Sequence, residues 1–96
     1  MLIGRITGTA VATVKQDTLS SYRLLLVVPC DPSGTDSGHP FIAVDLVGAG
    51  EGELVFVSQG SSARTAAGNL QAAADAAVVG ILDSLFHEGK QTFTKK

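Results

Sequence analysis

Residues 41–58 read FIAVDLVGAGEGELVFVS, and this stretch decides the fold. Its two ends, residues 41–47 and 53–58, are rich in β-branched and aromatic side chains, which favour strands. Between them, glycine occupies every second position from 48 to 52. Such spacing indicates backbone conformations that are closed to other residues, or close approach by another chain. The stretch therefore predicts two strands joined by a tight, glycine-rich turn.

Two further strands are expected before this stretch. Residues 1–14 alternate between apolar and polar positions and include three threonines, which is typical of a strand with one buried face. Residues 22–28 (YRLLLVV) form a short apolar run that ends at Pro29, as in a strand covered on both faces. The next segment, residues 31–40 (DPSGTDSGHP), consists largely of turn formers and predicts an exposed loop.

The pattern over residues 66–86 leaves helix and strand as open alternatives. Alanine is abundant there and apolar residues recur near helical spacing, which favours a helix. The run at 78–82 (VVGIL) is instead typical of a strand, and Gly80 would cost a helix about 1 kcal/mol relative to alanine. Four strands with short connections already make a sheet or a barrel, and a fifth strand here would close it.

Composition narrows the class of protein. The chain has 96 residues, enough for one domain, and is 45% hydrophobic and 17% charged with a formal net charge of −2. So few charges on so small a domain indicate apolar surface that further copies of the chain cover. Because no basic stripe is present, we expect no nucleic acid as a partner. We expect no signal peptide and no membrane span, since no apolar run approaches the roughly 20 residues that a span needs.

Two segments have a passing likeness to catalytic or nucleotide-binding motifs. Residues 47–52 resemble a phosphate-binding loop, but strand residues follow where such a loop requires a helix. A hydrolase triad would need Ser61 or Ser62 together with His39 and Asp45. The segment lacks the second glycine of a nucleophile elbow, so this hydrolase hypothesis rests on a serine turn alone.

A metal site is not expected either. Asp31, Asp36 and His39 share one loop, but zinc sites normally use more Cys and His, and no calcium-loop spacing is present. We therefore predict no catalytic residue, no cofactor and no metal. A different hypothesis is a module of the OB type that binds single-stranded nucleic acid or oligosaccharide. Such modules use aromatic residues and a basic groove, whereas this chain has no Trp, one Tyr and an acidic balance.

Five segments carry a resemblance to a known family. They are LIGRITGT (2–9) followed by AT (12–13), LLLV (24–27), AVDLVGAG (43–50) followed by GE (52–53), GSSAR (60–64) and DAAVVGILD (75–83). In this order, and in a chain of this length, they resemble the EutN/CcmL family, the pentameric vertex proteins of bacterial microcompartments. The loop at 32–39 and the tail depart from the family pattern, and Leu54 stands where related sequences often carry tryptophan.

The resemblance implies an all-β fold, a five-stranded OB-like β-barrel with a short helical turn, which assembles as a ring. It implies that residues 76–85 form a strand and that any helix lies before them. It also implies a single domain over residues 1–86, followed by a C-terminal tail over 87–96.

For function, the resemblance implies a structural protein and not an enzyme. Five copies would form a homopentamer at the vertex that closes a bacterial microcompartment in the bacterial cytoplasm. Its partners would be hexameric and pseudohexameric shell proteins, with no nucleic acid and no membrane involved. The candidates for the subunit interface or the pore rim are Gly48, Ala49, Gly50, Glu51, Gly52, Glu53, Ser61, Ser62 and Arg64.

Overall fold

The computed structural model of the chain describes residues 1–11, 22–60 and 75–95. Its strands are β1 (Leu2–Ala10), β2 (Leu24–Cys30), β3 (Phe41–Asp45), β4 (Leu54–Gln59), β5 (Ala76–Ile81), β6 (Ser84–His87) and β7 (Lys90–Thr94). The described residues contain no helix, and so none that could span a membrane. The all-β expectation is confirmed, whereas the helical turn that we expected before residue 76 falls outside the described residues.

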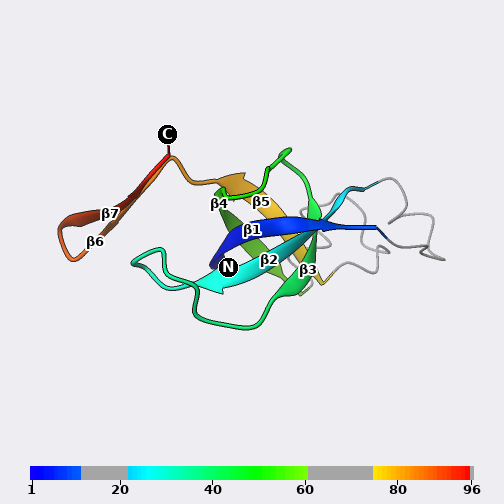
Figure 1. Ribbon diagram of the computed structural model, residues 1–96, viewed down its shortest axis with the longest axis horizontal. Coiled ribbons are helices and arrows are strands. Elements are labelled where there is room, and N and C mark those ends of the chain that lie inside the picture. The colour runs from blue at the N-terminus through cyan, green and yellow to red at the C-terminus, as the bar shows by residue number, and fades with distance from the viewer. Residues whose placement is uncertain (12–21, 61–74, 96) are drawn as a thin grey trace.

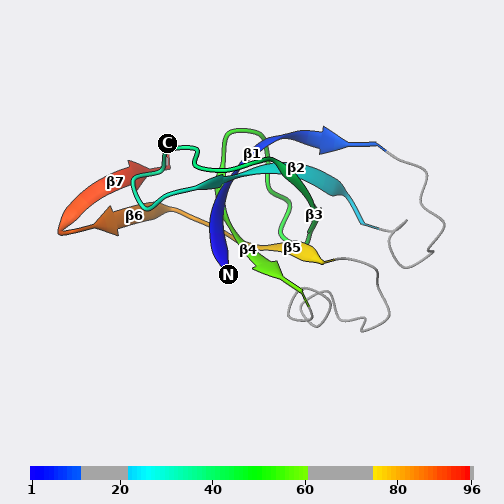
Figure 2. The same cartoon turned by 90° about the horizontal axis from the view of Figure 1, so that it is seen from below.

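The first five strands form a sheet that closes on itself (Figures 1 and 2). Hydrogen-bonded neighbours follow the order β1-β2-β3-β5-β4, and β4 pairs back with β1. The pairings are antiparallel except for the one between β3 and β5, which is parallel. A closed sheet leaves no long strand edge for uncontrolled pairing with other chains. The fifth strand that would close the sheet is β5.

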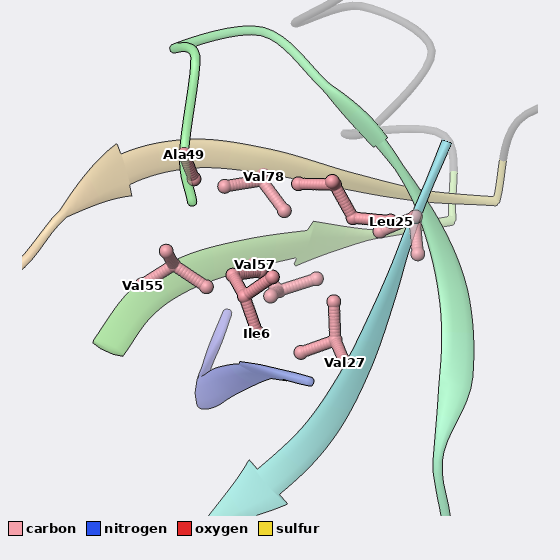
Figure 3. Close-up of a cluster of buried hydrophobic side chains, with 9 residues drawn as sticks. Ile6, Leu25, Val27, Ala49, Val55, Val57 and Val78 are labelled. Atoms are coloured by element: carbon pink, nitrogen blue, oxygen red, sulfur yellow. The ribbon is translucent and has the colours of Figure 1, made fainter. Parts of the chain in front are cut away.

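The core lies inside this closed sheet and is built from alternate positions of its strands (Figure 3). In β2, Leu25 and Val27 are fully buried while Leu24 and Leu26 are half-buried, because successive side chains of a strand point to opposite faces. The largest fully buried side chains are Ile6, Leu25, Val27, Val55, Val57 and Val78. These are aliphatic side chains without polar atoms, as expected for a core of this small size.

The strand expected over residues 76–85 is wrong at its C-terminal end. It stops at Ile81. The N–H of Leu82 still donates to the carbonyl oxygen of Leu54 (2.9 Å), but Leu54 is the first residue of β4, so β4 offers no partner to the residues that follow. Strands β6 and β7 then form a separate hairpin. Both residues of its turn have positive φ, 53° at Glu88 and 80° at Gly89, which suits the twist of a two-residue hairpin.

This β6–β7 hairpin extends away from the closed sheet in both views (Figures 1 and 2). It covers residues 84–94 and so crosses the boundary between residues 86 and 87 where we placed the start of the tail. The division into a domain and a tail stays a prediction. The residues beyond β5 are structured as a hairpin, which the sequence pattern did not indicate.

Candidate functional site

The candidate residues 48–53 lie in one turn, the glycine turn (residues 46–53), which joins β3 to β4. Gly48 and Gly52 have φ values of 76° and 87°, in the left-handed region that favours glycine. Between them, Ala49 is fully buried and belongs to the core cluster, where Figure 3 places it beside Val78. The turn therefore folds back over the interior of the closed sheet, where the methyl group of Ala49 packs against the core.

Asp45, at the end of β3, holds the first half of this turn. Its Oδ1 accepts hydrogen bonds from the backbone N–H groups of Val47 (3.1 Å), Gly48 (2.9 Å) and Ala49 (3.3 Å). Its Oδ2 lies 3.5 Å from a guanidinium nitrogen of Arg23, and that nitrogen also donates to the carbonyl oxygen of Ala49 (3.0 Å). Because the Asp45 side chain is only 3% exposed, this network replaces its hydration.

Glu53 holds the second half of the turn. Its Oε1 accepts the N–H of Gly50 (2.6 Å), and its Oε2 lies 3.0 Å from the Nζ of Lys95. The hydrogen bond from Gly50, followed by the one from Lys95, lowers the pKa of the Glu53 carboxyl. Backbone bonds between Ile6 and residues 52 and 53 fasten the turn to β1.

A surface hollow lies between the glycine turn and the end of β7. It is lined by Glu51, Gly52, Glu53, Phe93, Thr94 and Lys95. Glu51 is exposed at this position, while Glu53 is engaged by Gly50 and Lys95. The structure thus brings six of the nine candidate residues together in one turn. The remaining three, Ser61, Ser62 and Arg64, lie outside the described residues.

The turn is not arranged as a phosphate site. The strand β4 follows it directly, whereas a phosphate loop leads into a helix N-terminus. The N–H groups that a phosphate would need are already bonded to Asp45 and Glu53. Asp45 is equally unsuited to a hydrolase triad with His39, because Oδ1 and Oδ2 are taken by the turn and by Arg23.

The acidic residues of the 31–40 loop also have structural partners. Asp31 accepts hydrogen bonds from the N–H groups of Ser33 (2.9 Å) and Thr35 (3.1 Å). Asp36 makes a two-point ion pair with Arg5 of β1, with Nε 3.1 Å from Oδ1, and this pairing lowers the pKa of Asp36. Within residues 1–11, 22–60 and 75–95, no group of three or more His, Cys, Asp and Glu side chains is placed to hold a metal ion.

Three cations of the described residues are each paired with a carboxylate and so do not offer free positive charge to a phosphate backbone. Arg5 is paired with Asp36, Arg23 with Asp45 and Lys95 with Glu53. Sequence reasoning missed Arg23 and Lys95 as parts of the turn. Each lies far along the chain from the carboxylate that it contacts, and no local pattern signals such a contact.

The outer surface of the closed sheet carries apolar side chains at two places. On one side, Phe56 of β4 is 40% exposed and lies between Ile3 of β1 and Gly80 of β5 in the strand register. On another, Ile42 of β3 is 45% exposed and pairs with the half-buried Leu26 of β2. Two different apolar faces on one small subunit are what a head-to-tail contact between copies needs.

The chain matches the family model described as ethanolamine utilisation protein EutN/carboxysome over residues 1–83. It belongs to the EutN/CcmL family. The shell vertex protein GrpN of Rhodospirillum rubrum is 45% identical over 85 residues, which cover 88% of this chain and 96% of GrpN. The resemblance found in the sequence is therefore confirmed.

Solved structures of EutN/CcmL proteins have the same fold as this chain. CcmL of Nostoc sp. PCC 7120 superposes with a TM-score of 0.89 at 40% identity, covering 99% of this chain and 100% of CcmL. The pentameric microcompartment shell protein GrpN of Rhodospirillum rubrum superposes with a TM-score of 0.82 at 42% identity. That match covers 91% of this chain and 99% of GrpN.

Proposed function

We propose that five copies of this chain form the vertex of a bacterial microcompartment shell in the bacterial cytoplasm. The observation that carries this function is the match to shell vertex proteins along nearly the whole chain, one of them solved as a pentamer. The chain is a structural protein and not an enzyme. Asp45 and Glu53, the carboxylates of the glycine turn, are bonded to that turn, which fits a structural role.

The geometry of shell closure gives the ring its function. A flat sheet of six-fold tiles cannot close, and five-fold units supply the curvature. The ring contact is heterologous, so one face of each subunit meets a different face of the next and the rotation must close. Hexameric and pseudohexameric shell proteins are the partners that would surround the vertex. The closed five-stranded sheet, in which β3 and β5 pair in parallel, is compatible with an OB-like barrel.

The glycine turn is our candidate for a place where copies meet. Apart from each glycine and its chain neighbours, no atom of residues 1–11, 22–60 and 75–95 lies within 4 Å of the place where a Cβ of Gly48 or Gly52 would stand, so another backbone can approach them closely. Gly50, Glu51, Ser61, Ser62 and Arg64 are further candidates for this contact or for the pore rim. The hydrogen bonds that Asp45 and Glu53 accept from the turn support this role, since a preformed turn loses little entropy on binding.

Native mass spectrometry of the purified full chain across a dilution series tests the vertex function. We expect a dominant species at five times the chain mass that persists on dilution, because the ring must form before it can occupy a vertex. Co-assembly with six-fold shell proteins is the next step. A monomer at every concentration would contradict the ring and leave the exposed apolar faces of β3 and β4 without a partner.

Replacing Phe56 with aspartate should weaken the ring. A charge on the outer face of β4 would have to lose its hydration in a subunit contact, so we expect the concentration at half-dissociation to rise roughly tenfold or more. The matched control is Gln59→Asp, which adds the same charge at an exposed position of the same strand. Equal pentamer stability in wild type and Phe56→Asp would show that this face of β4 takes no part in the subunit contact.

A further inference from the structure

Among the described residues, two polar contacts join the β6–β7 hairpin and the residue after it to the glycine turn and the 31–40 loop. The Oγ1 of Thr92 donates to the carbonyl oxygen of Pro32 (2.8 Å), and the Nζ of Lys95 pairs with Glu53 (3.0 Å). At the tip of the hairpin, Phe86 is 65% exposed. A two-stranded hairpin is marginally stable by itself in water. Its position against the closed sheet must therefore depend on such contacts at its base.

Glu53 stands at the meeting point of three elements. It directly precedes β4, its Oε1 closes the glycine turn through Gly50, and its Oε2 holds Lys95 directly after β7. The two oxygens of one carboxylate thus serve two segments that are far apart in sequence. The Glu53 side chain is 24% exposed and the Lys95 side chain 43%, so the pair is partly shielded from solvent on the Glu53 side.

We propose that Glu53 is a latch that couples the glycine turn to the C-terminal hairpin. When the turn has the observed shape, Oε1 is fixed by Gly50 and Oε2 is aimed at Lys95. A change in the turn moves both oxygens together, because a carboxylate is a rigid planar group. The hairpin, with its exposed Phe86, is therefore positioned by the glycine turn and not only by its own strands.

The latch has a consequence for assembly that rests on the proposed function. When a neighbouring copy in the ring contacts the glycine turn and shifts it, the Glu53 carboxylate moves with the turn and changes the position of Lys95 and the hairpin. Ring formation and hairpin placement would then favour each other. The latch itself is a property of the single chain and does not depend on the ring.

Hydrogen exchange of individual amides, followed by NMR on the full chain, tests the latch. Glu53→Gln keeps an oxygen for the Gly50 N–H and removes the charge that attracts Lys95, and Lys95→Met removes the other partner. In both variants we expect the amides of β6 and β7 to exchange about two- to fivefold faster, the range for loss of a partly exposed ion pair. Amides of β1–β5 should keep their wild-type rates.

Two further variants separate a latch from a general loss of stability. Asp75→Asn is the matched control, because it removes the same charge from an exposed residue that lies outside both the glycine turn and the hairpin. Its hairpin should exchange at the wild-type rate. The double variant Glu53→Gln/Lys95→Met should exchange no faster than either single variant, since both remove one interaction.

Wild-type exchange of the hairpin in Glu53→Gln would overturn the latch, and so would equal acceleration in Asp75→Asn. Each sample is also examined by native mass spectrometry, so that an altered oligomeric state is recognised. A wild-type chain that stays monomeric would contradict the ring. The latch is then tested on the monomer, in which Glu53→Gln should still accelerate the exchange of the hairpin amides. A pentamer with unchanged hairpin exchange in Glu53→Gln would contradict the latch alone.

Discussion

The Asp45→Ala variant is expected to lose about 3 kcal/mol of unfolding free energy, the scale for a buried carboxylate whose partners are left behind. Three backbone N–H groups of the glycine turn lose their acceptor, and Arg23 loses its ion pair. The turn would no longer be held over the core, so Ala49 would leave its fully buried position. No other described residue serves so many backbone donors of this turn.

Urea denaturation at a fixed protein concentration measures this loss, because the stability of an oligomer depends on concentration. Asp36→Ala is the matched control. It removes an ion pair with Arg5 in which both side chains are exposed to solvent, and such pairs contribute little to the free energy of unfolding. Asp45→Asn should fall between wild type and alanine, since it keeps an oxygen for the turn but not the charge facing Arg23. An Asp45→Ala midpoint equal to that of Asp36→Ala would show that the turn holds its shape without the carboxylate.

The Gly4→Ala variant is expected to be the second most damaging change, with a loss of about 2 kcal/mol, the scale for overpacking a core. A Cβ at this buried position would overlap Cγ1 of Val27 and lie 3.3 Å from the carbonyl oxygen of Val28. Val27 is fully buried and β-branched, so its χ1 cannot rotate easily to make room. The effect comes from packing, since Gly4 is not among the glycines with positive φ.

Thermal or urea unfolding of three variants tests this explanation. Gly8→Ala, on the same strand, should cost much less, because among the described residues a Cβ there meets only the Glu51 carboxylate, at an ordinary 3.7 Å. In the double variant Gly4→Ala/Val27→Ala the added methyl group takes the space of the removed ones. The combined loss should therefore be smaller than the sum of the two single losses. Strict additivity would mean that Gly4 and Val27 do not compete for the same space.

Much of the fold follows from short patterns in the sequence. The strands expected over 22–28, 41–47 and 53–58 appear as β2, β3 and β4 with ends shifted by one or a few residues. The predictions for these segments are correct because the alternation of apolar and polar residues and the content of β-branched residues indicate which face of a strand is buried. The glycine turn was also foreseen, since glycine at 48 and 52 has positive φ, for which it is the favoured residue.

Residues after 75 were predictable only in part. The apolar run around Gly80 gave helix and strand similar support, and the resemblance to EutN/CcmL proteins favoured the strand that the structure contains. The break after Ile81 depends on where β4 begins, because Leu82 bonds to Leu54, the first residue of that strand, which is distant in sequence. The hairpin that follows has a Glu-Gly turn, yet its polar strands lack the alternation that marks a buried face.

By itself, the sequence determined four of the strands, the glycine turn and, through its ordered motifs, the resemblance to the EutN/CcmL family, which implied the all-β class. These properties depend on local periodicity, on backbone conformations that favour glycine, and on the order of motifs. Only the tertiary structure decided that Asp45 is held by Arg23, that Glu53 reaches Lys95, and that Gly4 faces Val27. The physical reason is that these contacts join residues distant in sequence, and their distances are set when the sheet closes.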